Sequence, residues 1–154
     1  MIRLKRVLVP TDFSDFSASA VQFGCELAGR FDAELHLLNV VQNPLTHYPE
    51  QRALVPMDEF ELELKAVARQ QLEETPEPPW NKKLVIVRYV CVGSPYLEIV
   101  RYAKTNDIDL IVIATHGRSG FSHVLVGSVA ERVVRKAPCP VMTVRDPDQR
   151  FVMP

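Results

Sequence analysis

The chain has 154 residues, of which 47 % are hydrophobic and 24 % are charged, and its formal net charge at pH 7 is -1. A chain of this length is expected to form one domain, and its balanced charge excludes a dedicated nucleic-acid binder, which would carry a clustered basic excess. No apolar run is long enough to cross a bilayer and no signal-peptide pattern opens the chain, so we expect neither a nucleic acid nor a membrane as partner.

Three cysteines occur in the chain, Cys25, Cys91 and Cys139, and none belongs to a CxxC pair. An odd number of cysteines without metal-binding or redox spacing is typical of reduced thiols packed inside a protein. We therefore expect a cytoplasmic location and no catalytic cysteine.

Short β-branched runs alternate along the chain with longer segments of helical periodicity, which is the pattern of βαβ units. Strands are predicted at Arg6–Pro10, Ala33–Val41, Lys83–Val92, Asp109–Ala114 and Val141–Val144. Helices are predicted at Ser14–Arg30, Met57–Glu74, Pro95–Asn106 and Ser128–Ala137, with a proline-rich break at 75–81. The pattern predicts an α/β fold, a single doubly wound, Rossmann-like parallel sheet of five strands with about four helices. We expect one domain over residues 1–146 and a C-terminal tail at 147–154.

Helical spacing also predicts which side chains the helices bury. For the first helix the predicted apolar face consists of Phe16, Ala20, Phe23, Leu27 and Phe31, with Ser14 as N-cap. For the helix that follows Gly93, the residues predicted to point inward are Leu97, Val100 and Ala103.

Two loops carry polar chemistry at the ends of predicted strands, where doubly wound sheets bind their ligands. One is Pro10-Thr11-Asp12-Phe13-Ser14, and the other runs from Ala114 to Ser128. Asp12 can accept a ribose hydroxyl, as acidic residues do in other nucleotide folds. The alternative is that Asp12 is only a turn or cap residue before a helix.

The second loop has the composition of an anion site. Gly117 and Gly120 allow positive φ and close approach of the backbone, and Arg118 can contact an outer phosphate. Gly127-Ser128 opens a helix whose first amides lack intrahelical partners and carry a partial positive charge. The alternative for Ser128 is a capping box with Glu131, which needs no ligand.

Four segments together resemble the universal stress protein family over about residues 3–145. They are Val9-Pro-Thr-Asp12, Thr115-His-Gly-Arg-Ser-Gly120, Gly127-Ser-Val-Ala-Glu-Arg-Val-Val134 and Ala137-Pro-Cys-Pro-Val141. The nucleotide-binding branch of the family carries Gly, two residues, Gly, nine residues, Gly, then Ser or Thr. Gly117, Gly127 and Ser128 match this pattern, whereas Ala114 stands in place of the first glycine.

This resemblance implies an ATP or AMP site, with Mg²⁺ held mainly by the phosphates and the adenine near Val40. The residues expected to bind the nucleotide are Pro10, Thr11, Asp12, Val40, Ala114, His116, Gly117, Arg118, Gly120, Gly127, Ser128 and Val129. An alanine held at positive φ at position 114 would cost about 1–2 kcal/mol, which weakens binding about tenfold, whereas a negative φ would cost nothing.

The sequence predicts no catalytic residues and no protein metal ligands. A Walker A lysine, a nucleophile elbow and paired carboxylates are all missing, so slow ATP hydrolysis is the most that we expect. The predicted function is an adenine-nucleotide-binding regulatory protein of the stress response, acting on an unidentified protein partner. The alternative is a dimeric interaction module that binds no nucleotide. In a sheet ordered 3-2-1-4-5 the last strand lies at an edge, and the resemblance implies a homodimer through Val141–Val144.

Overall fold

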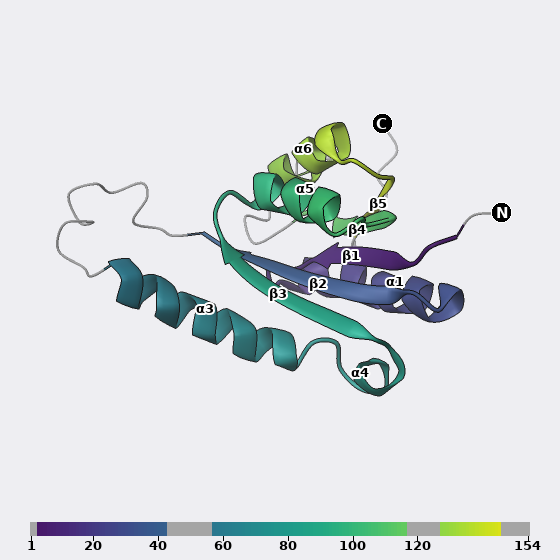
Figure 1. Ribbon diagram of the computed structural model, residues 1–154, viewed down its shortest axis with the longest axis horizontal. Helices are drawn as coiled ribbons and strands as arrows, with labels where there is room; N and C mark the ends of the chain where they lie inside the picture. Colours follow the sequence, from purple (N-terminus) through teal and green to yellow (C-terminus); the bar gives the residue numbers. More distant parts are fainter. Residues whose placement is uncertain (1–2, 43–56, 117–126, 146–154) are drawn as a thin grey trace.

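The computed structural model describes residues 3–42, 57–116 and 127–145, and these form an α/β fold around one parallel sheet (Figure 1). The strand order is β3-β2-β1-β4-β5, and every pairing is parallel, as predicted. The strands are β1 (Arg6–Pro10), β2 (Glu34–Val41), β3 (Ile86–Val92), β4 (Leu110–Ala114) and β5 (Val141–Val144). The helices are α1 (Asp15–Phe31), α3 (Met57–Glu73), α4 (Trp80–Lys83), α5 (Pro95–Thr105) and α6 (Ser128–Lys136).

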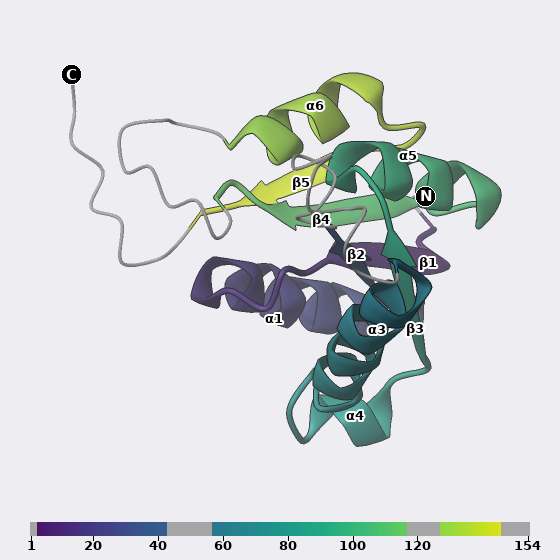
Figure 2. The same ribbon diagram turned by 90° about the vertical axis from the view of Figure 1, so that its left-hand side faces the viewer.

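Helices cover both faces of the sheet, and each face has its own core (Figure 2). Under α1 and α3 the core contains the fully buried side chains of Val9, Leu35 and Leu72. Under α5 and α6 it contains those of Leu8 and Ile111. Burial on both faces explains why the central strands read as continuous apolar runs.

The predicted apolar face of α1 is wrong in part. The helix buries its small residues, among them Ala20, Gly24 and Ala28, whereas Phe23 and Phe31 remain 48 % and 43 % exposed. A small-residue face lets the helix backbone approach the sheet closely, which large aromatic side chains would prevent. Helical spacing therefore found the helix but not the side that faces the sheet.

The same kind of correction applies to α5. Ala103 is buried as predicted, but Leu97 is 45 % exposed, and Ile99 and Tyr102 occupy the core in its place. Ser94 is the N-cap residue and Pro95 begins the helix, as the sequence predicted.

The expectation of about four helices missed α4, and β3 begins at Ile86 rather than Lys83. The short helix follows Pro79, and its amide groups bond back along the chain, with the Leu84 amide donating to the Trp80 carbonyl at 3.2 Å. Trp80 and Leu84 both pack against the core beneath α1. Burial of the indole ring therefore holds a helical turn where the prolines indicated only a break.

A buried polar cluster links β2 to α5. His36 is 5 % exposed, and its Nδ1 lies 2.9 Å from the Tyr102 hydroxyl. Its Nε2 lies 3.4 Å from a carboxylate oxygen of Glu34, which also pairs with Arg6. Burial lowers the pKa of His36 from its usual 6.5, and Arg6 acts in the same direction, against the smaller raising effect of Glu34. The imidazole is therefore neutral in the folded protein at neutral pH.

This lowered pKa predicts loss of stability in mild acid. The unfolded chain binds a proton at His36 below about pH 6.5, whereas the folded chain binds it only at a lower pH. The contribution of neutral His36 to the free energy of unfolding should therefore be complete above pH 6.5. It should fall as the pH drops toward the pKa of His36 in the folded protein. Urea unfolding of the wild type and of His36→Gln, which cannot titrate, at about pH 8 and about pH 5 measures the difference. Equal losses in the two proteins would contradict the assignment.

All three cysteines are free thiols, as expected. Burial raises the pKa of Cys25 to about 12 and that of Cys91 to about 11, with smaller raising effects from Glu26 and Glu98 respectively. Both groups therefore stay protonated at neutral pH, and a protonated thiol is a poor nucleophile.

Candidate functional site

The candidate site lies where the strand order reverses. β1 has β2 on one side and β4 on the other, so the segments that leave β1 and β4 diverge to opposite faces of the sheet. Such a switch point forms a crevice at the carboxyl ends of the strands. Pro10 ends β1, Ala114 ends β4 and Val40 lies near the end of β2, so the fold brings these three predicted site residues to the same edge.

The segment after β1 is held by its own side chains. The Thr11 hydroxyl lies 2.9 Å from the Ser17 hydroxyl and accepts the Phe13 amide at 3.1 Å. Oδ1 of Asp12 accepts the Ser14 amide at 3.0 Å and also the Ser14 hydroxyl. Ser14 is the N-cap of α1, since its oxygen accepts the Ser17 amide at 3.2 Å. The turn-and-cap reading of Asp12 is therefore correct, and it leaves the nucleotide reading open because a carboxylate can accept about four hydrogen bonds.

Phe13 has a left-handed backbone conformation, with φ of 63°. This conformation costs a residue that carries a Cβ about 1–2 kcal/mol. Here it is enforced by the bond of the Phe13 amide to Thr11 and of the Ser14 amide to Asp12. The strain turns the chain sharply between β1 and α1 and places Asp12 at the sheet edge.

Two substitutions that both remove the phenyl ring isolate this strain. Phe13→Gly should be more stable than Phe13→Ala by about 1 kcal/mol, because only glycine adopts positive φ without penalty. Elsewhere in a chain alanine is normally the more stable of the two. Thermal or urea unfolding of both variants gives the order, and an alanine variant equal to or above the glycine variant would show that the turn is unstrained.

Asn39 is a site residue that the sequence reasoning missed. It is 6 % exposed near the end of β2, and its side-chain amide donates to the Thr11 carbonyl at 2.8 Å. The Thr11 amide in turn donates to the Leu38 carbonyl at 2.9 Å. The sequence did contain a sign of this role, because Asn39 is the one polar residue in the apolar run Leu37-Leu-Asn-Val-Val41 and a buried polar group needs a partner. Asn39 fixes the position of the backbone that carries Asp12.

Ala114 does not have the strained backbone that would have weakened the site. The described residues with positive φ, apart from glycine, are Phe13, Asp32 and Asp107, and Ala114 is extended within β4. Its side chain is 8 % exposed and belongs to the core beneath α1. The methyl group therefore fills core space and carries no cost in backbone strain.

The start of α6 is pressed against the end of β4. The Gly127 amide donates to the Thr115 carbonyl, and a Cβ at position 127 would lie 2.8 Å from that oxygen. Gly127 has φ of -64°, so close approach and not positive φ explains the glycine. This contact places the first turn of α6 beside the carboxyl ends of β1 and β4.

The capping box of Ser128 and Glu131, which was the alternative to an anion site, is not formed. Gly127 is the N-cap residue of α6 and has no side chain to accept from the helix amides, while Ser128 is the first helical residue and is exposed. Glu131 pairs with Arg135 at 2.9 Å, one turn further along the helix. Among the described residues, no side chain caps the amides of the first turn, which include those of Ser128 and Val129. Such amides and the helix dipole together favour an anion.

His116 lies next to α1. Its Nδ1 is 3.0 Å from the Thr115 hydroxyl, and its ring centroid is 6.0 Å from that of Phe16 in α1. The imidazole is therefore next to the start of α1, on the same side as Thr11 and Asp12. The predicted site residues Gly117, Arg118 and Gly120 lie outside the described residues.

In the part of the chain that the structure describes, no three residues among His, Cys, Asp and Glu are grouped so that they could hold a metal ion. Over the same ranges, no helix combines the length and apolar character needed to span a bilayer.

The fold and this edge of the sheet define a doubly wound α/β domain in which a helix with a glycine N-cap begins beside the switch point. Residues 3–145 match the Universal stress protein family, and the chain belongs to that family. It is 35 % identical to universal stress protein MJ0531 of Methanocaldococcus jannaschii over 144 residues, which cover 93 % of this chain and 83 % of that protein.

Solved structures agree with this assignment. Universal stress protein UspA from Lactobacillus plantarum superposes with a TM-score of 0.81 at 30 % identity, covering 94 % of this chain and 100 % of that one. A universal stress protein in complex with cAMP shares the fold, with a TM-score of 0.62 at 23 % identity over 94 % of this chain and 98 % of that one.

Proposed function

We propose that this protein binds an adenine nucleotide, ATP or AMP, at the carboxyl ends of β1 and β4, and acts as a regulatory module of the stress response. The observation that carries the proposal is the first turn of α6, which the Gly127 contact with Thr115 holds at the carboxyl end of β4, the strand next to β1. The protein of the same fold in complex with cAMP supports it, since an adenine nucleotide is compatible with this architecture.

Five of the predicted site residues have roles that their positions permit. The amides of Ser128 and Val129 and the α6 dipole receive phosphate oxygens, and the Ser128 hydroxyl donates a further bond. Asp12 accepts a ribose hydroxyl, while Pro10 and Val40 line the side on which the adenine packs. Mg²⁺ is held through the phosphates. Domain boundaries at 1–146, a tail at 147–154 and a cytoplasmic location belong to the same proposal, the last because all three thiols are free.

Isothermal titration calorimetry with ATP and with AMP tests this function. Asp12→Asn keeps the oxygen that accepts from Ser14 but removes the charge, so ATP affinity should fall about tenfold. Glu26→Gln, at an exposed position in the second half of α1, makes the same charge change away from the site and should leave affinity unchanged. Absence of binding to the wild type, or equal affinities in the two variants, would refute the assignment.

The edge strand β5 supports a second function, assembly of two copies into a homodimer. The Thr115 amide donates to the Val144 carbonyl and the Ile111 amide to the Pro140 carbonyl, so even-numbered positions of β5 bond to β4. The backbone groups of Val141 and Thr143 consequently face outward, free to pair with an antiparallel copy. The Val144 side chain is 5 % exposed and lies in the core, so the side chains nearest the partner are those of Met142 and Thr143.

A proline at position 143 tests the dimer. Thr143→Pro removes an outward-facing amide, which an edge strand tolerates, so the variant should fold and sediment as a monomer while the wild type sediments as a dimer. Thr143→Ser keeps the amide and should remain dimeric. A wild type that is monomeric at micromolar concentration would contradict the dimer and leave the nucleotide site to be judged by calorimetry.

A further inference from the structure

The other edge of the sheet is β3, a strand of seven residues. The Leu35 amide donates to the Val85 carbonyl and the Gly93 amide to the Val41 carbonyl, so odd-numbered positions of β3 bond to β2. Because consecutive residues of a strand direct their backbone groups to alternate sides, those of Ile86, Arg88 and Val90 face outward. In the described part of the chain, no strand pairs with β3 on that side (Figure 2).

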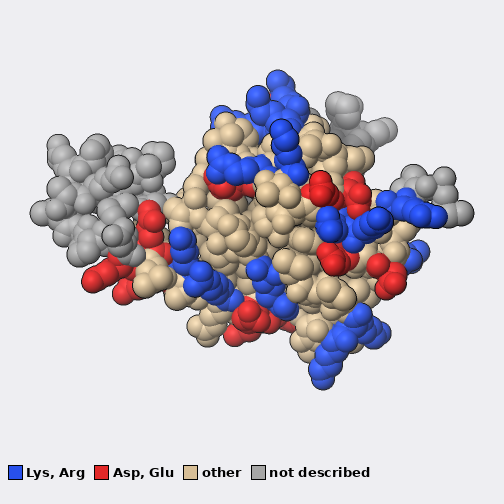
Figure 3. All heavy atoms as spheres, in the orientation of Figure 1, with Lys and Arg blue, Asp and Glu red and all other residues tan. Residues whose placement is uncertain are grey.

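One face of this edge is apolar and exposed. Val85, Val87 and Tyr89 are 65 %, 37 % and 49 % exposed, and they lie on the side of the sheet that α5 covers, since the Tyr89 ring is 5.2 Å from that of Tyr102. Figure 3 shows an uncharged area between β3 and α5, with Lys and Arg atoms beside it. A long edge strand with exposed apolar side chains on one face is a ready template for pairing with another chain.

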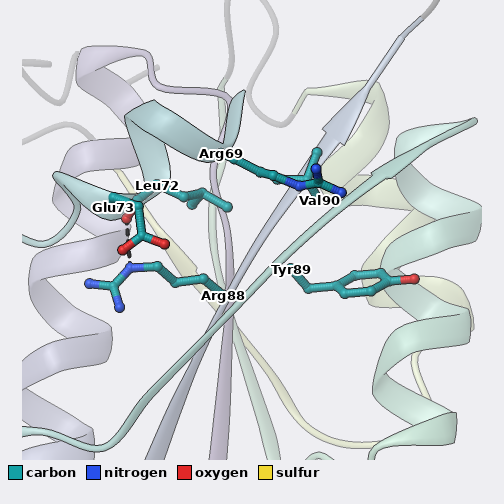
Figure 4. Close-up of a pocket in the computed structure, with 6 residues that line it drawn as sticks. All are labelled: Arg69, Leu72, Glu73, Arg88, Tyr89 and Val90. Carbon is teal, nitrogen blue, oxygen red and sulfur yellow. Dashed lines mark hydrogen bonds between the residues drawn. The ribbon is translucent and has the colours of Figure 1, made fainter. Parts of the chain in front are cut away.

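The opposite face of the edge is basic. Arg88 and Tyr89 point to opposite sides of β3, and Arg69 reaches from α3 toward Val90, above a hollow of about 270 Å³ (Figure 4). The Arg88 guanidinium is held by the Leu72 carbonyl at 2.7 Å and the Thr75 carbonyl at 2.9 Å. Both carbonyls are neutral, so the guanidinium keeps its charge. Glu73 is the acidic residue among those that line the hollow.

A further cation extends this basic face. Lys65 lies one turn before Arg69 on α3. Arg69 and Arg88 line the hollow beside the edge, which favours a partner with negative charge on that face.

These charges decide between two occupants of the edge. A second copy pairing antiparallel about Arg88 would bring Arg69 and Arg88 of both copies together, and like charges placed opposite each other destabilise a strand pair. An extended segment whose alternate side chains are acidic and apolar satisfies both faces at once. Its acidic residues would lie beside Arg69 and Arg88, and its apolar residues beside Val87 and Tyr89.

We propose that the outer edge of β3 binds an extended segment of a partner protein as a sixth strand, one in which Asp or Glu alternates with apolar residues. Main-chain hydrogen bonds to the outward groups of Ile86, Arg88 and Val90 supply affinity, and the two faces supply specificity. This surface is separate from the nucleotide site and from β5, so the proposal stands independently of both.

Amide hydrogen exchange with two synthetic peptides tests the proposal. The first alternates glutamate with valine and tyrosine over about seven residues, and the second has lysine at every glutamate. At about 1 mM the glutamate peptide should slow exchange of the Ile86, Arg88 and Val90 amides about tenfold, and the lysine peptide should not. Amides of Val87 and Tyr89, which already bond to β2, should change little.

A charge reversal supplies the matched variants. Arg69→Glu should weaken the glutamate peptide at least about threefold and strengthen the lysine peptide, whereas Lys136→Glu, an equal charge change at the end of α6, should do neither. Both positions are exposed on helices, so both variants should fold. No protection by the glutamate peptide, or equal protection by the two peptides, would overturn the proposal. Protection of the same amides without peptide that grows with protein concentration would also overturn it, since a second copy would then cover the edge.

Discussion

Gly127→Ala should lower the free energy of unfolding by about 1–3 kcal/mol and weaken ATP binding about tenfold or more. The reason is the backbone contact at the start of α6, where an added Cβ would lie 2.8 Å from the Thr115 carbonyl oxygen. Backbone cannot swing aside as a flexible side chain can, so α6 must move away from β4. The amides proposed to hold phosphate would move with it.

Ser128→Ala is the matched control, because it changes the next residue without adding an atom near β4. Ser128 is exposed, so stability should stay within about 0.5 kcal/mol of the wild type. Loss of its hydroxyl should weaken ATP about two- to tenfold, which corresponds to one hydrogen bond. Thermal unfolding without ligand and calorimetry with ATP separate the two effects. If Gly127→Ala kept full affinity, the nucleotide would not be held at this helix.

Gly24→Ala and Gly29→Ala should change stability in opposite directions, although both lie in α1. At Gly24 an added Cβ would overlap Cγ2 of Val9, which is fully buried and has no room to retreat. We expect a loss of about 1–3 kcal/mol, even though alanine is the better helix former. At Gly29 the Cβ would meet the Trp80 ring at 3.4 Å, an ordinary contact, so the gain in helix propensity should stabilise the protein by about 0.5–1 kcal/mol.

Differential scanning calorimetry of the two variants measures this difference, at about 2–4 °C for each kcal/mol in a protein of this size. A Gly24 variant as stable as the wild type would mean that α1 does not approach β1 as closely as described. A Gly29 variant that loses stability would mean that Trp80 does not leave the space that the structure gives it.

The order of elements could be predicted from the sequence because the strands are buried on both faces and read as apolar runs between helical segments. The faces of the helices could not. Phe23 and Leu97 are exposed while Gly24 and Tyr102 are buried, because close packing of α1 against β1 and the bond between His36 and Tyr102 decide which side faces inward. Both causes involve a residue outside the helix concerned, so the periodicity of the helix alone does not contain them.

At the candidate site the loops were found from their composition, but their internal bonding was not. Ser128 reads as a cap in the sequence, yet the contact of Gly127 with Thr115 starts the helix one residue earlier. Asn39 escaped notice because its partner is a backbone carbonyl 28 positions away. Contacts of this kind depend on the pairing of β1 with β2, which a local pattern does not contain.

The position of the phosphates of a bound nucleotide tests the proposed function most directly. A crystal structure of the protein grown with excess ATP and Mg²⁺ should show phosphate oxygens within hydrogen-bond distance of the Ser128 and Val129 amides, with the ribose against Asp12. A nucleotide bound elsewhere, or an α6 N-terminus that meets no phosphate under these conditions, would contradict it.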